Sequence, residues 1–242
     1  MATQTRKKAL SPEDFYRTAL DALTGSSAPF LVGGAYALRT YSGIQRETKD
    51  LDVFCKAGDY PRLLAALAAE GFETELTNPN WLAKARLGEY YVDIIFNSAN
   101  RLCLVDDTWF EQARDCDLLN HQVKLVPAEE MIWSKSMVQD RFRFDGADVA
   151  HIIRQEGETL DWRRLLNRME ALWEVLFEQI MLFRFVYPAD REKVPRWLVQ
   201  ELLNRVTLEL DLPRSHDRVC RGRILSRSQY ETDYEEWGYK PT

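Results

Sequence analysis

The pattern of apolar residues changes at Pro127, and this change is the feature that most limits what the chain can fold into. Before Pro127, short apolar runs alternate with amphipathic stretches, which is typical of an α/β domain built on a mixed sheet. After it, strand patterns stop and apolar residues recur with helical spacing. We therefore predict a mixed sheet flanked by helices over residues 1–127 and a helical domain with a charged tail over residues 128–242.

The same patterns predict the individual elements. A serine cap, an early proline and a terminal glycine mark helix ends, and Gly88-Glu89 predicts a hairpin turn between two strands. The predicted strands cover residues 29–32, 51–54, 72–76, 81–87, 90–96 and 122–126. The predicted helices cover residues 12–25, 35–41, 59–70, 109–119, 128–141, 146–155, 162–186 and 195–208.

Composition places the chain among ordinary globular proteins, with 45% hydrophobic and 29% charged residues. No apolar run approaches the ~20 residues of a membrane-spanning helix, and no secretory signal is recognisable. Four widely spaced cysteines without a CxxC pair predict reduced thiols rather than a zinc site. We therefore predict a cytoplasmic protein with no membrane partner. The net charge of −6 argues against a surface coated for non-specific nucleic-acid binding.

Two aspartates, Asp50 and Asp52, lie in a predicted strand whose other residues are apolar. Residues two apart in a strand point to the same face, so the two carboxylates can converge on one spot. Two like charges held together need compensation, which bound magnesium would supply. The alternative is a solvated pair at a strand edge.

A third carboxylate, Asp93, lies in the apolar strand predicted over residues 90–96. A lone carboxylate among apolar neighbours is costly to bury without a partner. If its strand lies beside that of Asp50 and Asp52, the three carboxylates match a two-magnesium phosphoryl-transfer site. Alternatively, Asp93 pairs with an arginine or lysine in a structural ion pair.

Gly33 and Gly34 lie between a predicted strand and a predicted helix. Glycine lets a phosphate approach the backbone closely, and the start of a helix presents free N–H groups and a positive dipole end. The pair therefore suits a nucleotide's phosphates, but an ordinary strand-to-helix turn would have the same sequence.

The order of these residues resembles the motif of the DNA polymerase beta-type nucleotidyltransferase superfamily. It consists of Gly33-Gly34, fifteen further residues, Asp50-Leu51-Asp52 and a later strand aspartate. Residues 32–38 and 46–50 look most like the bacterial branch that contains AbiEii-type toxin enzymes. The resemblance covers residues 28–155 and implies a nucleotidyltransferase-type fold in the first domain.

The resemblance implies transfer of a nucleoside monophosphate from an NTP, such as ATP, to an acceptor hydroxyl, with release of pyrophosphate. Asp50 and Asp52 would hold two Mg²⁺ ions, with Mn²⁺ as a substitute, and Asp93 would hold the catalytic metal and help deprotonate the acceptor. Gly33 and Gly34 would cradle the triphosphate. The acceptor would be tRNA, a protein hydroxyl or a small molecule such as an aminoglycoside. A toxin–antitoxin role is implied by the resemblance alone. The alternative is a protein of this fold that binds nucleotide, or a partner, without transferase activity.

A second block of the sequence resembles the same branch, whose members carry a helix lysine near the nucleotide phosphates. By this resemblance Lys135 would act as a point charge on the triphosphate, and Arg141 would assist it. In this branch basic and acidic residues follow the lysine, here Arg141, Asp145 and Asp148. For Asp145 the competing interpretation is that, together with Asp148, it caps the next helix. Lys49 and Arg46, beside the acidic pair, would either contact phosphate or only neutralise the acidic cluster.

Clustered arginines followed by acidic residues make up the C-terminal region. With the tyrosines nearby, the arginines could contact an RNA acceptor. We favour the simpler interpretation that the acidic tail folds against the basic stretch. The arginines are Arg214, Arg218, Arg221, Arg223 and Arg227, and the acidic residues are Glu231, Asp233, Glu235 and Glu236.

Overall fold

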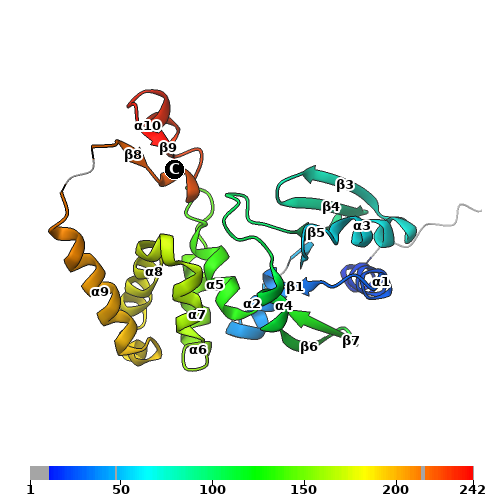
Figure 1. Ribbon diagram of the computed structural model, residues 1–242. Coiled ribbons are helices and arrows are strands. Elements are labelled where there is room, and N and C mark those ends of the chain that lie inside the picture. Colours follow the sequence, from blue (N-terminus) through cyan, green and yellow to red (C-terminus); the bar gives the residue numbers. More distant parts are fainter. Residues whose placement is uncertain (1–10, 47, 214–215, 242) are drawn as a thin grey trace, which may run out of the picture. The chain divides into compact units, whose positions relative to one another are not determined.

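The computed structural model describes residues 11–46, 48–213 and 216–241, and Arg214 of the C-terminal cluster lies outside them. Contacts divide the chain into two compact units (Figure 1). The first holds the described residues up to Ala37 together with Gln45–Val126, and the second holds Leu38–Ile44 together with the described residues from Pro127 onward. The chain therefore passes into the second unit between Val126 and Pro127, and one earlier segment belongs with that unit.

A seven-stranded mixed sheet forms the centre of the first unit, in the order β3-β4-β5-β2-β1-β7-β6. The pairs β2–β5 and β1–β7 are parallel, and the other neighbours are antiparallel. The predicted fold class, a mixed sheet flanked by helices, is confirmed. The strands are β1 (Leu31–Val32), β2 (Asp50–Phe54), β3 (Glu73–Asn78), β4 (Leu82–Leu87), β5 (Tyr90–Ile95), β6 (Arg114–Leu118) and β7 (His121–Leu125).

One face of this sheet is packed by α1 (Pro12–Gly25) and α3 (Tyr60–Ala69). Ser11 caps α1 by accepting a hydrogen bond of 3.1 Å from the N–H of Asp14. Phe15 of α1 stacks on Tyr90 of β5 with ring centroids 5.2 Å apart. On β2, Leu51 and Val53 are fully buried toward these helices. The alternate residues of each strand consequently point to the opposite face.

The opposite face is covered at one end by α4 (Asp107–Glu111), whose Trp109 ring stacks on Phe54 of β2 at 5.5 Å. The helix α2 (Gly34–Ser42) begins directly after β1, and its residues from Leu38 belong to the second unit. The face of the sheet that carries Asp50 and Asp52 is therefore bounded by Phe54 at one end of the strand.

The second unit is mostly helical. α5 packs against α6 and α7, and α6 packs against α8. No helix among the described residues is long and apolar enough to cross a membrane. The elements are α5 (Ala128–Ser136), α6 (Gly146–Glu156), α7 (Trp162–Arg168), η1 (Glu170–Leu172), α8 (Trp173–Val186), η2 (Pro188–Lys193), α9 (Arg196–Leu210), β8 (Val219–Cys220), η3 (Gly222–Ile224), α10 (Glu231–Glu235) and β9 (Lys240–Pro241).

The helix predicted over residues 109–119 is wrong. Only α4 forms there, and the chain continues as β6, which pairs with β7 in a hairpin. Leu119 and Asn120 at its turn have φ of 53° and 66°, the left-handed values that a tight hairpin needs. The sheet pairing therefore overrides the helical pattern that the sequence suggests in this segment.

Two long predicted helices are shorter in the structure. The helix predicted over 128–141 ends at Ser136, and a tight turn follows in which the N–H of Asp140 donates to the carbonyl of Arg143 at 2.8 Å. The helix predicted over 162–186 is interrupted at Met169 and resumes at Trp173. This interruption lets α7 pack against α5 while α8 packs against α6.

Candidate active site

Three carboxylates lie on the face of the sheet opposite α1 and α3. β2 and β5 run parallel with Asp52 paired to Asp93 and Asp50 paired to Tyr91. Paired residues on neighbouring strands point to the same side, and so do residues two apart on one strand. The structure therefore brings Asp50, Asp52 and Asp93 together on one face of the first unit.

A lysine that no sequence motif marks lies beside them. Lys84 on β4 is paired with Asp93, and its ammonium lies 2.8 Å and 3.1 Å from the two carboxylate oxygens. The ion pair considered for Asp93 is thus present. The hairpin predicted around Gly88-Glu89 is confirmed, with Leu87 opposite Tyr90, and counting back from that turn places Lys84 opposite Asp93. The signal for this partner was therefore present in the sequence.

The charges on this face shift the pKa values of Lys84 and Asp50. Burial lowers the pKa of Lys84, but the hydrogen bond to Asp93 and the negative charges of Asp93, Asp50 and Asp52 outweigh it and raise that pKa. Burial and the charge of Asp93 raise the pKa of Asp50, and Lys84 offsets only part of this. Because the negative charge of Asp93 raises the pKa of Asp50 even with Lys84 nearby, a cation beside Asp50 would be stabilised.

The donor set fits a hard divalent cation. Carboxylate oxygens are the ligands that Mg²⁺ and Mn²⁺ prefer, and Asp50, Asp52 and Asp93 supply them. Even so, no three His, Cys, Asp or Glu side chains in the described part of the chain stand close enough together to hold a metal ion as they are. In this arrangement Asp93 is neutralised by Lys84 instead.

The turn between β1 and α2 leaves no room for side chains at Gly33 or Gly34. A Cβ on Gly33 would overlap the ring of Phe54, and a Cβ on Gly34, whose φ is +53°, would overlap Oδ2 of Asp52. The N–H of Gly33 donates to the carbonyl of Asp52 at 2.9 Å. The two glycines therefore let the carboxylate of Asp52 lie directly against the start of α2. That Gly33 and Gly34 bind a triphosphate stays a prediction.

Two tyrosines support the loop that leads into β2. The hydroxyl of Tyr16 on α1 donates to the carbonyl of Thr48 at 2.6 Å, and its ring meets that of Tyr36 edge to face at 5.3 Å. Burial raises the pKa of Tyr16, and the charges of Asp50 and Asp52 add to this effect while a hydrogen bond with Tyr36 opposes it. Tyr16 thus lies close to the acidic face. Its spacing on α1 marks it only as a core residue, so no sequence signal set it apart.

Lys49 does not lie against the acidic pair. It is exposed and forms an ion pair with Glu89 in the turn between β4 and β5. The hydrogen bond and charge of Glu89 raise the pKa of Lys49. A contact between Lys49 and a nucleotide phosphate stays a prediction.

Lys135 lies in the second unit within a buried ion cluster. Its ammonium is 2.9 Å from Asp145 and 2.8 Å from Asp148, and Arg143 also binds Asp145 at 3.1 Å. Asp145 stands at the cap position of α6, but its side chain makes no capping hydrogen bond and is used in these ion pairs instead. Arg141 is exposed in the turn before α6. The phosphate contacts of Lys135 and Arg141 stay predictions.

The C-terminal tail folds back on the arginine-rich stretch through β8 and β9. Arg223 lies over the ring of Tyr234 at 5.3 Å, and Arg218 lies over Tyr239 at 4.5 Å. Arg221 forms an ion pair of 3.4 Å with Glu174 on α8. Within the described residues, no arginine of this stretch forms an ion pair with the acidic residues of the tail. Aromatic rings therefore hold the tail against this stretch.

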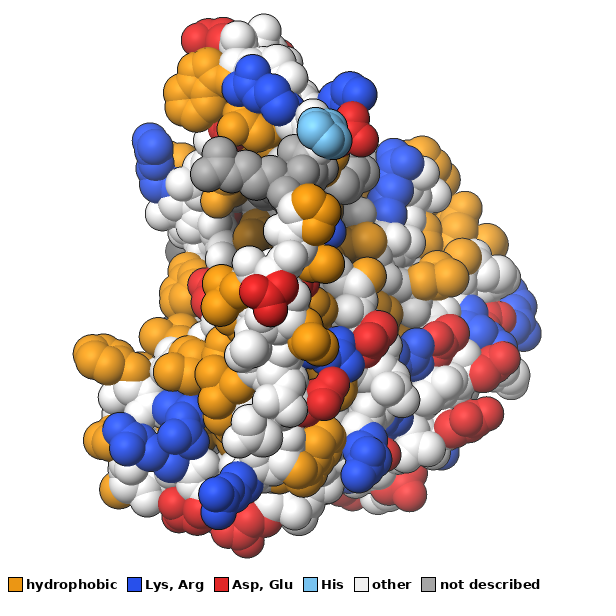
Figure 2. Space-filling view, turned by 60° about the vertical axis from the view of Figure 1, so that its left-hand side comes forward, with side chains coloured by type: hydrophobic (Ala, Val, Ile, Leu, Met, Phe, Trp, Pro, Cys, Tyr) orange, Lys and Arg blue, Asp and Glu red, His pale blue; other side chains and the backbone are white. Residues whose placement is uncertain are grey.

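Charge is mixed on the face of the molecule that Figure 2 shows. Among the described side chains visible in Figure 2, basic and acidic groups lie interspersed among hydrophobic and uncharged ones.

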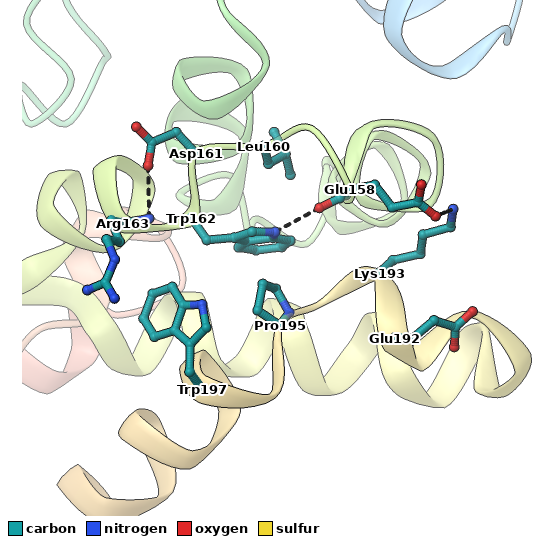
Figure 3. Close-up of a pocket in the computed structure, with 10 residues that line it drawn as sticks. Glu158, Leu160, Asp161, Trp162, Arg163, Glu192, Lys193, Pro195 and Trp197 are labelled. Carbon is teal, nitrogen blue, oxygen red and sulfur yellow. Dashed lines mark hydrogen bonds and ion pairs between the residues drawn. The ribbon is translucent and has the colours of Figure 1, made fainter.

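A separate hollow of about 500 Å³ lies in the second unit, between the start of α7 and the segment from η2 to α9 (Figure 3). Trp162 donates from its indole N–H to the carbonyl of Gly157 at 2.8 Å, and Arg163 lies over the ring of Trp197 at 4.7 Å. The hollow contains none of the predicted site residues. Its polar groups are largely used within the chain, as in the ion pair between Lys193 and Glu158.

No protein-family model matches the chain, and no curated protein matches its sequence. Among solved structures, it is similar to the antibiotic-resistance factor ANT(2'')-Ia, with a TM-score of 0.46 and 15% identity over 73% of this chain and 93% of that one. It is also similar to the lincosamide antibiotic adenylyltransferase LnuA, with a TM-score of 0.42 and 18% identity over 58% and 94% of the two chains. JHP933 from Helicobacter pylori gives a TM-score of 0.42 and 13% identity over 94% and 97%. Similarities at these TM-scores do not assign a function to this chain.

Proposed function

We propose that this protein is a metal-dependent nucleotidyltransferase that moves a nucleoside monophosphate from an NTP to an acceptor hydroxyl. The observation that carries the proposal is the parallel register of β2 and β5, which sets Asp50, Asp52 and Asp93 on one face of the sheet. Burial and the charge of Asp93 raise the pKa of Asp50, and a bound cation would relieve this effect. Oxygen ligands favour Mg²⁺, with Mn²⁺ as a substitute.

In the proposed reaction, the acceptor oxygen forms a bond to the α-phosphorus of the NTP while the bond from that phosphorus to the bridging oxygen breaks and pyrophosphate leaves. Asp50 and Asp52 would hold the metals, and Asp93 would hold the catalytic metal and accept the proton of the acceptor hydroxyl. When bound, the metals would stabilise the charge on the attacking and leaving oxygens. Gly33 and Gly34 would let the triphosphate approach the N–H groups at the start of α2.

The acceptor and the branch of the superfamily belong to the proposal as well. From the resemblance of the sequence, the acceptor is an RNA such as tRNA, a protein hydroxyl or a small molecule such as an aminoglycoside. A toxin role and a partner antitoxin follow from the resemblance to the AbiEii-like branch alone. Lys49, Lys135 and Arg141 would complete the phosphate site in this proposal.

One observation favours a second function. Lys84 already neutralises Asp93, and a lysine fixed there permanently would remove the third carboxylate from catalysis. A chain of that kind would bind nucleotide without transferring it. The two functions differ in whether any acceptor becomes labelled.

The test is to incubate the protein with Mg²⁺ and each α-labelled NTP in turn, with tRNA, protein and aminoglycoside acceptors. We expect one acceptor to be labelled, and we expect Asp52→Ala to abolish the labelling. Asp115→Ala is the matched control, because Asp115 is an exposed carboxylate on β6 of the same sheet. Labelling that survives in Asp52→Ala would contradict the proposal, and tight nucleotide binding without any labelling would favour the second function.

A further inference from the structure

We propose that Lys84 is a built-in counter-ion, which holds Asp93 until a divalent metal displaces it and thereby weakens the metal affinity of the acidic face. The inference rests on the proposed function, because it takes Asp50, Asp52 and Asp93 as metal ligands. It explains why three carboxylates share one face of the sheet while no ready-made metal cage exists among the described residues.

The position of Lys84 follows from the backbone. It is paired with Asp93 across two antiparallel strands, so its side chain emerges on the same face as the carboxylate. Its ammonium reaches both oxygens of Asp93, at 2.8 Å and 3.1 Å, and lies 5.6 Å from the centre of the Tyr91 ring. The contacts with Asp93 and Tyr91 hold the ammonium over β5, beside the strand that carries Asp50 and Asp52.

The ion pair of Arg86 on the same strand serves as a comparison for that of Lys84. It lies two residues beyond Lys84 on the same face and pairs with Glu73 on β3, and both of those side chains are about half or more exposed. In contrast, the side chains of Lys84 and Asp93 are 35% and 17% exposed. Lys84 also experiences the charges of Asp50 and Asp52 in addition to that of its partner.

The ammonium and a divalent metal compete for the same carboxylate. A metal bound by Asp93 would lie close to the ammonium, and two cations at such a distance repel each other. The metal can therefore bind with full affinity only when Lys84 leaves Asp93. The pair between Lys84 and Asp93 consequently opposes metal binding and, in the absence of metal, compensates part of the repulsion among the carboxylates.

The test is to measure Mn²⁺ binding to the full chain without nucleotide, by calorimetry and by the electron paramagnetic resonance of free Mn²⁺. We expect Lys84→Met to tighten Mn²⁺ binding about tenfold, the factor that corresponds to losing one charge-assisted hydrogen bond. Lys84→Gln, which keeps a polar side chain, should also tighten Mn²⁺ binding. Arg86→Met is the matched control and should leave the affinity unchanged.

Adding Asp93→Asn to Lys84→Met should cancel the gain in Mn²⁺ affinity. Thermal unfolding of each variant checks that it is folded.

Affinity that is unchanged or weaker in both Lys84→Met and Lys84→Gln would overturn the inference, and so would an equal gain in Arg86→Met. Absence of Mn²⁺ binding in all folded variants would overturn it too, because nothing would then compete with Lys84. The transferase assay is independent of these outcomes. If the metal affinities change as expected but no acceptor is ever labelled, the proposed function fails while the counter-ion role stands.

Discussion

The two units each contain a lysine that binds aspartates, and the two clusters differ in charge balance. In the second unit, Lys135 lies between Asp145 and Asp148, and Arg143 adds a further positive charge. Burial raises the pKa of Asp145, but the hydrogen bond from Arg143 and the charge of Lys135 outweigh it and hold that pKa below its usual range. These carboxylates are satisfied within the chain.

In the first unit the pKa of an aspartate shifts in the opposite direction. Lys84 binds Asp93, and burial together with the charge of Asp93 raises the pKa of Asp50 instead of lowering it. Removing one partner from a buried ion cluster is strongly destabilising, whereas a partly exposed carboxylate with a raised pKa is a candidate ligand-binding group. We therefore propose that the first cluster binds a ligand, and that the ion pairs of the second stabilise the fold in addition to any phosphate contact of Lys135.

The largest effect we expect is on catalysis in the first cluster. Asp52→Asn keeps the size of the side chain but removes a charge that would hold metal, so transfer should fall at least about a thousandfold, or about 4 kcal/mol in the activation barrier. The free energy of unfolding should stay within about 1 kcal/mol of the wild type. Initial rates and urea unfolding measure the two quantities. A large loss of stability with little loss of rate would reverse the assignment of the two clusters.

The second prediction concerns stability in the other cluster. Lys135→Met leaves Asp145 and Asp148 buried without their ammonium, which should lower the free energy of unfolding by about 3 kcal/mol. Lys84→Met should lower it by less than about 1 kcal/mol in the absence of metal, because its cluster is more exposed. Urea unfolding of both variants gives the comparison. Equal losses of the free energy of unfolding in the two variants would show that the clusters do not differ in stability because of their burial.

The third prediction tests the contact between Gly34 and Asp52. Gly34→Ala should lower the free energy of unfolding by about 2 kcal/mol, because the new Cβ adds a clash with Asp52 to the strain of a positive φ. Gly43→Ala is the matched control, since Gly43 has φ of +74° and open space around its Cβ position. It should lose only about 1 kcal/mol. Gly34→Ala should also lower the metal affinity, and Gly43→Ala should not. Equal losses of stability and of metal affinity in the two variants would show that the contact with Asp52 is not the cause.

The smallest effect concerns pH. Because the pKa of Asp50 is raised in the folded protein, the folded state keeps a proton that the unfolded chain has already lost just above pH ~4. The contribution of Asp50 to the free energy of unfolding should therefore decline as pH rises through that window. Asp50→Asn should lack this decline, and saturating Mg²⁺ should suppress it in the wild type. Urea unfolding across pH 4 to ~7 measures it. If the contribution of Asp50 to the free energy of unfolding grew with pH, its pKa would not be raised in the folded protein.

Much of the first unit could be predicted because its strands obey simple alternation. Leu51 and Val53 point to one face of β2 and Asp50 and Asp52 to the other, which is the arrangement that period two implies. Lys84 was also predictable, because the hairpin turn at Gly88-Glu89 sets the register of the two strands that it joins. These features depend only on local sequence.

Other features depend on partners that are distant in the sequence. The parallel pairing of β2 with β5 is long-range, since β3 and β4 come between them in the chain. β6 was missed because it is an edge strand with few buried side chains, so it shows no apolar alternation to detect. The contact of Tyr16 with Thr48 joins a helix to a loop. Such contacts are set by tertiary packing, which a single sequence does not display.

The most direct test of the central claim is the position of the transferred label. With an acceptor identified, parallel reactions would use the same NTP labelled at the α-phosphate or at the γ-phosphate. The proposed reaction at the acidic face of the sheet predicts that α-label appears on the acceptor and γ-label appears only in pyrophosphate. Transfer of the γ-label to the acceptor, or transfer of α-label that is equally fast in Asp52→Asn, would contradict it.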